Sequence, residues 1–166
     1  MKHWLTTDTH FAHGKMIEFC GRPNNFEDII EKGLLQIPHG DTLIHLGDIC
    51  IGQDQDRHNR YIKPLQCKKI LVLGNHDKKS ATWYMNNGWD FVTDGIRLRL
   101  FGKRILLTHI PQPWDGWYDI NIHGHFHNAD YRKQDPGLSK ILTDKHKLLA
   151  LEYTDYKPVL IENFIK

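Results

Sequence analysis

Residues 70–77 read Ile-Leu-Val-Leu-Gly-Asn-His-Asp, which is a run of four apolar residues followed by glycine and three polar residues. A short apolar run bounded by glycine is typical of a buried strand. The polar residues Asn75, His76 and Asp77 therefore lie just beyond the carboxyl end of a predicted strand. In α/β sheets ligands collect where the strands end, so this stretch predicts both a buried sheet and a functional edge.

Two earlier segments repeat this pattern of an apolar strand with polar residues at its end. Residues 2–7 predict a short strand that runs into Asp8, and Thr42–Leu46 predicts a strand that ends in Gly47-Asp48. Between them, residues 26–37 place their apolar side chains on one helical face. This alternation of strands and helices is typical of a parallel α/β sheet.

Two more helices are predicted in the first half of the chain. One runs from about Asp54 to Leu65, with apolar residues on its inner face. A shorter one begins after Ser80, whose side chain suits an N-cap, and stops at Gly88.

The second half is richer in strands. Apolar and basic residues alternate over 96–100, and a Gly-Lys turn at 102–103 leads into residues 104–108, which predicts a hairpin with one solvated face. Further strands are predicted at 119–123, 147–153 and 158–164. We therefore predict one α/β domain over residues 1–166, a two-sheet sandwich flanked by helices and without a cap domain.

The composition excludes several classes of protein. The chain has 166 residues, is 40% hydrophobic and has a formal net charge of +2, far from that of a protein that coats DNA. No apolar run approaches the roughly 18 residues that a membrane helix needs, and the start lacks the apolar stretch of a signal peptide. Three widely spaced cysteines favour a reduced, cytoplasmic protein over a disulfide framework. The composition and the hydrophobic pattern therefore predict neither binding to a membrane nor an obligate protein partner.

Metal-binding side chains gather at the predicted strand ends. The chain contains 12 histidines, and several follow strands directly. The candidate donors are Asp8, His10, Asp48, Asn75, His109, His125 and His127. Oxygen and nitrogen donors without a thiolate suit Mn²⁺, Fe, Zn²⁺ or Ni²⁺. Seven donors exceed the needs of one four- to six-coordinate ion, so they favour two ions that share a bridge.

These residues fall into five short blocks that resemble the ordered motifs of the calcineurin-like metallophosphoesterases. The blocks are Asp8-Thr9-His10, Gly47-Asp48, Gly74-Asn75-His76-Asp77, Thr108-His109 and Gly124-His125-Phe126-His127. Each block alone is a weak signal, whereas all five in order over residues 8–127 are a specific one. His13 and the Phe-Cys-Gly-Arg-Pro run at 19–23 resemble small, compact bacterial and phage-type members.

The resemblance implies a role for each of these residues. It implies that Asp8, His10 and His127 hold one divalent ion, and that Asn75, His109 and His125 complete the site of a second. It implies that Asp48 bridges the two ions. Mn²⁺ is the expected ion, with Fe, Zn²⁺ or Ni²⁺ as alternatives. His76 would be the general acid, steadied by Asp77.

The implied activity is hydrolysis of a phosphate ester by a dinuclear metal centre. A hydroxide that bridges the ions would attack phosphorus in line with the leaving oxygen, which His76 would protonate. We expect the substrates to be phosphodiesters, in nucleotides or cyclic nucleotides. The alternatives are a phosphomonoesterase, a nucleotide pyrophosphate hydrolase, an enzyme that cleaves polymeric nucleic acid, and a metal-stabilised interaction module without catalysis.

Four residues are candidate substrate contacts, each with a structural alternative. His13 follows the first ligand pair closely, and Arg22 could bind a phosphate oxygen or form a structural salt bridge. Trp114 and Trp117 could stack on a nucleobase or pack at the edge of the core. The basic segment 131–147 is predicted to be a solvated loop, with a lip for polyanions as the alternative.

Overall fold

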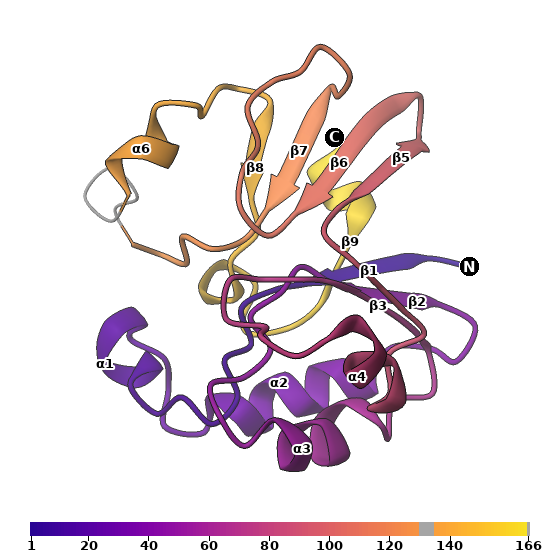
Figure 1. Cartoon of the computed structure of the whole chain (residues 1–166), viewed down its shortest axis with the longest axis vertical. Helices are drawn as coiled ribbons and strands as arrows, with labels where there is room; N and C mark the ends of the chain where they lie inside the picture. The colour runs from indigo at the N-terminus through magenta and orange to yellow at the C-terminus, as the bar shows by residue number, and fades with distance from the viewer. Residues whose placement is uncertain (130–134, 166) are drawn as a thin grey trace.

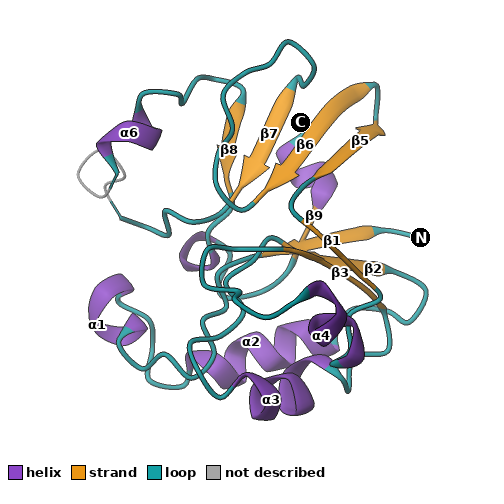
Figure 2. Ribbon diagram, in the orientation of Figure 1, coloured by secondary structure: helices purple, strands orange, loops and turns teal. Residues whose placement is uncertain are grey.

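Two β-sheets stack on each other, and most of the helices lie on the outer face of the first sheet (Figures 1 and 2). The computed structural model describes residues 1–129 and 135–165 of the chain. The predicted two-sheet α/β sandwich is confirmed. Part of the basic segment, residues 131–134, lies outside the described residues. The rest of that segment contains α6 (Pro136–Ser139) and β8 (His146–Leu148).

The first sheet has the strand order β4-β3-β2-β1-β9. Its strands are β1 (His3–Thr6), β2 (Thr42–His45), β3 (Lys68–Val72), β4 (Phe91–Thr93) and β9 (Val159–Leu160). The first four are parallel to one another, and β9 pairs antiparallel with β1. The carboxyl ends of β1, β2 and β3 therefore lie side by side.

The second sheet has the strand order β5-β6-β7-β8. Its first three strands are β5 (Ile96–Leu100), β6 (Lys103–Thr108) and β7 (Ile120–His123). The predicted hairpin is confirmed, since β5 and β6 are antiparallel, and β6, β7 and β8 are parallel. The carboxyl ends of β6 and β7 point toward the first sheet (Figure 1).

Helices α2 (Phe26–Leu35), α3 (Asp54–Arg57) and α4 (Ala81–Asn86) cover the outer face of the first sheet (Figure 2). A π-helical turn, His58–Ile62, continues α3. The predicted N-cap of α4 is confirmed, because Ser80 Oγ accepts a hydrogen bond of 3.1 Å from the Trp83 amide. A five-residue helix that the sequence did not predict, α1 (Met16–Cys20), stands beside the strand ends.

Each face of the first sheet has its own apolar core. One core lies between the sheet and its helices and includes Leu43, Leu71 and Ile30. The other lies between the two sheets and includes Leu5, Ile44 and others. This burial of alternate residues to opposite faces explains why the parallel strands read as continuous apolar runs.

Two predicted strands are shorter than expected. The predicted strand at 147–153 turns into a 3₁₀-helix at Leu151–Tyr153, because Leu149 packs in the core between the sheets and Leu151 in the core under the helices. The predicted strand at 158–164 becomes a 3₁₀-helix at Ile161–Phe164 for a related reason. A helical turn brings Ile161, Phe164 and Ile165 onto one core, which strand alternation does not allow.

The helices of the described residues include none that is long and apolar enough to cross a membrane.

Candidate metal centre

Loops from both sheets meet where the strands end. Several residues in these loops have positive φ angles, which are uncommon outside glycine. Five of the candidate ligands have left-handed backbone conformations, with φ between 47° and 75°: Asp8, His10, Asp48, His125 and His127. Such conformations are costly for residues other than glycine and are held only where surrounding structure enforces them. Their concentration at one place marks this edge as a built site.

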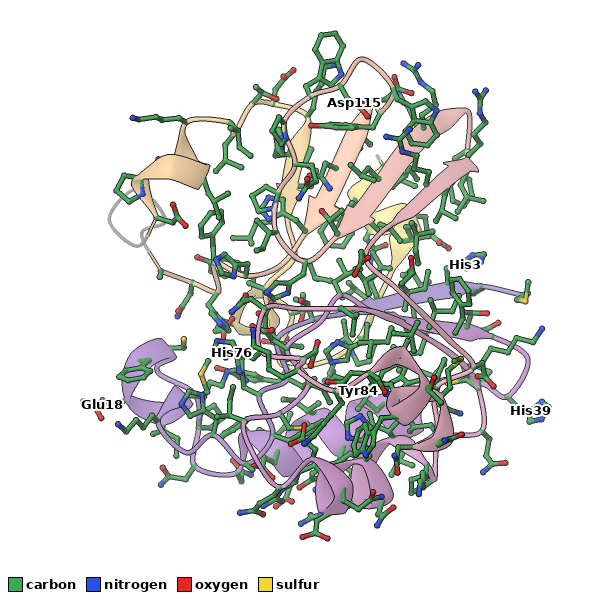
Figure 3. All side chains as sticks on the ribbon, in the orientation of Figure 1. His3, Glu18, His39, His76, Tyr84 and Asp115 are labelled. Carbon is green, nitrogen blue, oxygen red and sulfur yellow. The ribbon has the colours of Figure 1, made fainter. Side chains whose placement is uncertain are left out.

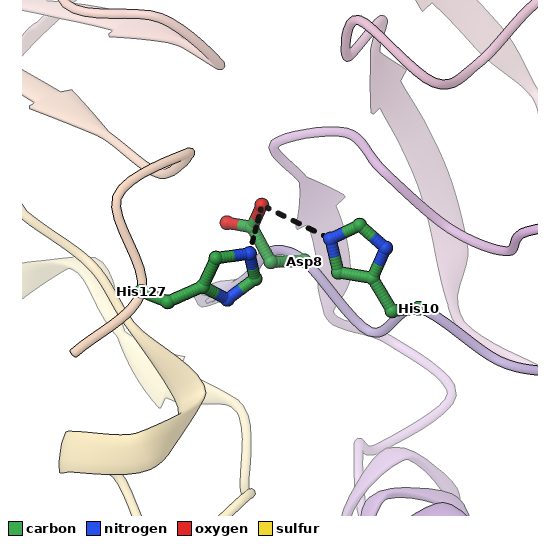
Figure 4. Close-up of side chains that lie close together, drawn as sticks. All are labelled: Asp8, His10 and His127. Atoms are coloured by element: carbon green, nitrogen blue, oxygen red, sulfur yellow. Dashed lines mark ion pairs between the residues drawn. The ribbon is translucent and has the colours of Figure 1, made fainter. Parts of the chain in front are cut away.

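One cluster joins the end of β1 to the loop after β7. Asp8 Oδ1 lies 3.8 Å from His10 Nε2 and 3.7 Å from His127 Nε2 (Figure 4). The three side chains offer ligand atoms that all lie within 4.8 Å of one another. All three are buried, so a cation among them would be largely shielded from water.

A second cluster contains Asp48, His109 and His125, whose ligand atoms also lie within 4.8 Å of one another. Asn75 joins them, since its Oδ1 lies 2.8 Å from His109 Nε2 and 2.9 Å from His125 Nδ1. The structure thus brings together all four residues predicted for the second ion.

Asp48 lies between the two clusters. Its Oδ2 is 3.7 Å from His10 Nε2 on one side and 3.3 Å from His109 Nε2 on the other. Its Oδ1 accepts a hydrogen bond of 2.8 Å from the His76 amide, which fixes the orientation of the carboxylate. One oxygen of Asp48 therefore faces ligands of both clusters, a position from which a carboxylate can bridge two ions.

Hydrogen bonds leave Nε2 of His109 as the nitrogen that can bind a metal. His109 Nδ1 lies 2.7 Å from the carbonyl oxygen of Leu46, which can only accept, so Nδ1 keeps its proton and Nε2, which faces the cluster, is the nitrogen that would give up its proton to a cation. Burial disfavours a second proton on this ring, but the carboxylates of Asp8 and Asp48 outweigh burial and raise its pKa to about 9. The cluster therefore attracts positive charge.

Divalent cations fit this set of donors. Among the described residues, Asp8 Oδ1 and His10 Nε2 are buried without a hydrogen-bond partner, a costly state that coordination to a cation would relieve. Imidazole, amide and carboxylate donors suit divalent transition metals. Two glycines allow the loops to approach, since a Cβ at Gly74 would collide with Asp48, and a Cβ at Gly124 would collide with Thr7 and Asp8.

His76 lies at the rim of the site, and Asp77 lies buried beneath it. The His76 ring is half exposed, and its Nε2 lies 4.0 Å from Asp48 Oδ2. Asp77 does not contact that ring, contrary to the expectation that it steadies His76. Its carboxylate instead accepts hydrogen bonds from the amides of Asp48, Ile49 and Gly74, so it binds the loop after β2 to the loop after β3.

Comparisons with known proteins agree with this geometry. Residues 1–160 match the model of the calcineurin-like phosphoesterase family. The chain belongs to this family. An uncharacterised protein of Methanocaldococcus jannaschii is 26% identical to the phosphoesterase over an alignment of 178 positions, gaps included, that covers 99% of this chain and 90% of the relative. The crystal structure of a protein of unknown function from Aquifex aeolicus is 27% identical, has a TM-score of 0.76 and matches 99% of this chain and 97% of its own. An archaeal phosphodiesterase is 21% identical, with a TM-score of 0.47 over 77% of this chain and 74% of its own.

Family membership makes the chain a metal-dependent phosphoester hydrolase, and the two clusters are its candidate metal sites.

Arg22 of the phosphoesterase is a structural residue in the described structure, and this placement argues against the predicted phosphate contact. Its side chain is buried, and it donates hydrogen bonds to Glu152 and to the backbone oxygens of Asp8 and Thr9. The guanidinium therefore fixes the backbone of the loop after β1, which carries Asp8 and His10, and does not face the open side of the centre.

Trp114 and Trp117 lie away from the centre, so they do not form the predicted stacking wall beside it. Asp115, between them in sequence, lies at the opposite end of the second sheet from His76 (Figure 3). Trp117 stacks under the guanidinium of Arg97, with 4.9 Å from the ring centroid to Cζ. The other predicted contact, His13, does lie at the site, with its ring centroid 5.6 Å from that of His10.

Two cavities open beside the phosphoesterase's metal centre, and Asn75 lines both. One, of about 380 Å³, is lined by candidate ligands and by residues of α1, including Met16 and Phe19. The other, of about 330 Å³, extends from Asn75 and His109 toward Asp94 and Gln112. The centre is therefore accessible from two directions.

Glu152 is a candidate functional residue that the sequence did not reveal. The 3₁₀-helix Leu151–Tyr153 turns its carboxylate inward, where Oε1 lies 2.7 Å from Arg22 Nη2 and 3.5 Å from His127 Nδ1. A carboxylate behind a histidine ligand orients the ring and increases its basicity. Cys20, His127 and Glu152 also form a possible metal group, but burial raises the pKa of the Cys20 thiol to about 11 and the Arg22 cation adjoins Glu152, which disfavours an ion there.

We predict that Glu152→Gln weakens metal binding at the first cluster by about 10- to 100-fold, because the carboxylate that faces His127 loses its charge. Calorimetric titration of metal-free protein with Mn²⁺ measures this change. Glu18→Gln, which alters an exposed glutamate on α1, is the control and should bind like the wild type. Unchanged affinity in Glu152→Gln would show that His127 does not depend on this carboxylate.

His45 holds two ligand loops together from within the core. Its Nδ1 accepts a hydrogen bond of 3.0 Å from the Gly47 amide, so its Nε2 carries the proton toward Thr9 Oγ1, also at 3.0 Å. Thr9 in turn donates to the carbonyl oxygen of Ile49 at 2.8 Å. Complete burial lowers the pKa of His45 to about 3, so the ring is neutral in the folded protein.

This buried histidine predicts a pH dependence of stability. Because burial lowers the pKa of His45 in the folded protein below the value of about 6.5 for an unperturbed histidine, the contribution of His45 is complete above pH 6.5 and is lost as the pH falls toward 3. The stability advantage of the wild type over His45→Asn should shrink by about 2 kcal/mol between pH 7 and pH 5. Urea unfolding of metal-free protein measures it, with exposed His39→Asn as the control. A constant difference between wild type and His45→Asn would contradict the assignment.

Proposed function

We propose that this phosphoesterase hydrolyses phosphodiester bonds, in nucleotides or cyclic nucleotides. The observation that carries the proposal is the pair of cavities that flank the metal centre and share Asn75. A phosphodiester carries a substituent on each side of phosphorus, and each substituent has a cavity to occupy. A monoester would fill only one of them.

We propose that two divalent ions bind, one held by Asp8, His10 and His127 and the other by Asn75, His109 and His125. Asp48, whose Oδ2 faces both groups, is proposed to bridge them. When bound, such ions neutralise the phosphoryl oxygens and increase the acidity of a water molecule for attack on phosphorus. Mn²⁺ is the proposed ion, with Fe, Zn²⁺ and Ni²⁺ as alternatives.

His76 is proposed to be the general acid. Its ring is half exposed at the mouth of the cavity, and a ring in that position reaches a substrate oxygen beside Asp48. Its proton passes to the leaving oxygen as the bond to phosphorus breaks, in line with the attacking water. Asp77 supports this step indirectly, since it fixes the backbone of the loops that carry Asp48 and His76.

The position of His76 in the cavity also favours a substrate over a protein partner. A metal-stabilised interaction module has no need for an exposed histidine beside a buried cluster of ligands, whereas hydrolysis does. The unpaired cysteines Cys20, Cys50 and Cys67 are buried thiols, which supports our proposal that the enzyme works in the reducing cytoplasm.

The test compares two substrates that share a leaving group. Metal-free protein is reloaded with Mn²⁺, and kcat/KM is measured for bis(p-nitrophenyl) phosphate and for p-nitrophenyl phosphate. We expect turnover that depends on the metal and favours the diester. Preference for the monoester would leave the metal chemistry in place and reject the diester proposal in favour of a phosphomonoesterase or a pyrophosphate hydrolase. Two bound ions without turnover of either substrate would favour the interaction module.

A further inference from the structure

An exposed aromatic side chain stands on the wall of the cavity that contains the metal ligands. Phe19 on α1 is 61% exposed, although it is among the largest apolar residues of the chain. It lines the same cavity as His10, His76 and His127. A large apolar side chain on the wall of a cavity that also contains candidate metal ligands is well placed to contact substrate.

The loop after β7, which carries His125 and His127, is hydrogen-bonded to α1 and so fixes the position of Phe19. Asn128 Nδ2 donates a hydrogen bond of 2.9 Å to the carbonyl oxygen of Cys20, the last residue of α1. Asn128 directly follows His127, so the end of α1 is tied to a candidate ligand. Met16, at the start of α1, is 3% exposed and anchors the helix in the core. The position of Phe19 relative to the metal centre is therefore defined.

A row of rings leads from the metal centre to Phe19. The ring centroid of His13 lies 5.6 Å from that of His10 and 6.2 Å from that of Phe19, which meets the His13 ring edge to face. The second cavity has a different lining, with Asp94, Thr108 and Gln112 beyond the ligands. The two sides of the centre thus differ in chemistry: an aromatic wall on one side and polar groups on the other.

We propose that Phe19, with His13 at its edge, binds a flat aromatic group of the substrate, such as a nucleobase, on the α1 side of the metal centre. The more polar substituent then occupies the cavity beside Asp94 and Gln112. This inference deepens the proposed function and rests on it. It also assigns to Phe19 the stacking role that the sequence suggested for Trp114 and Trp117.

The test measures binding with ligands that the enzyme does not hydrolyse. Phenylphosphonate and methylphosphonate share the phosphonate head and differ in the aromatic ring. Calorimetry with the Mn²⁺-loaded enzyme gives the dissociation constant of each. We expect the wild type to prefer phenylphosphonate by roughly tenfold, since stacking of a base on an aromatic side chain has this order of effect.

Phe19→Ala should reduce that preference to less than about twofold and leave the affinity for methylphosphonate unchanged, while Phe19→Tyr should restore it. Phe101→Ala, which removes another exposed phenylalanine in the turn between β5 and β6, is the control and should keep the wild-type preference. A wild type without preference, or a preference that survives in Phe19→Ala, would overturn the inference.

This binding experiment and the hydrolysis of the two p-nitrophenyl substrates together separate this inference from the diester proposal. If the preference for phenylphosphonate depends on Phe19 but the enzyme hydrolyses only monoesters, the role of Phe19 is supported and the diester proposal is rejected. If the enzyme hydrolyses diesters but Phe19→Ala binds both phosphonates like the wild type, the proposed function is supported and the role of Phe19 is rejected.

Discussion

Asp48→Asn is expected to reduce kcat/KM for bis(p-nitrophenyl) phosphate by about 10³-fold or more and to lower the number of bound metal ions. The substitution keeps the size of the side chain, and its amide oxygen can still accept the hydrogen bond from the His76 amide. It removes the negative charge from the position of Oδ2, which lies within 3.7 Å of ligands from both clusters. Two cations at such close range depend on that charge.

The measurement pairs steady-state kinetics with elemental analysis of the bound metal. Asp56→Asn, at an exposed position of α3, is the control and should retain wild-type kinetics and metal content. Two ions bound in Asp48→Asn with wild-type affinity would show that Asp48 does not bridge the clusters.

His76→Gln is expected to lower kcat by about 10²- to 10⁴-fold for substrates with poor leaving groups, the range typical of a general acid. The loss should be much smaller for p-nitrophenyl esters, because p-nitrophenolate leaves without protonation. Metal content should not change, since the exposed His76 ring belongs to neither cluster of ligand atoms.

The kinetics compare two diesters, methyl p-nitrophenyl phosphate and an alkyl phosphodiester without an activated leaving group. His39→Gln, at an exposed position, is the control and should retain both rates. An equal loss on both diesters would mean that His76 binds the phosphate and does not protonate the leaving oxygen.

Most of the candidate site could be predicted from the sequence, because its residues directly follow predicted strands. Parallel strands carry their carboxyl ends to one edge, so polar residues after β1, β2 and β3 had to be neighbours in the fold. The five blocks added the residues after β6 and β7, and the structure gathers all seven predicted ligands into two adjoining groups.

Residues whose roles depend on contacts across the fold could not be predicted. Glu152 lies 130 positions from Arg22 in sequence, and nothing near either residue indicates that they pair. The sequence also could not place Trp114 and Trp117 relative to the metal ligands, because the loop after His109 runs along the second sheet before β7 begins (Figure 1). Phe19 was singled out only as part of the run at 19–23, because α1 is too short to show a helical pattern that would have placed its side chain.

The most direct test of the dinuclear centre is a titration of metal-free enzyme with Mn²⁺, in which bound metal and hydrolysis of bis(p-nitrophenyl) phosphate are measured at each step. We predict that activity follows the filling of a second site and reaches its maximum at two ions per chain. Full activity with one ion per chain, or activity that persists in excess chelator, would contradict the account.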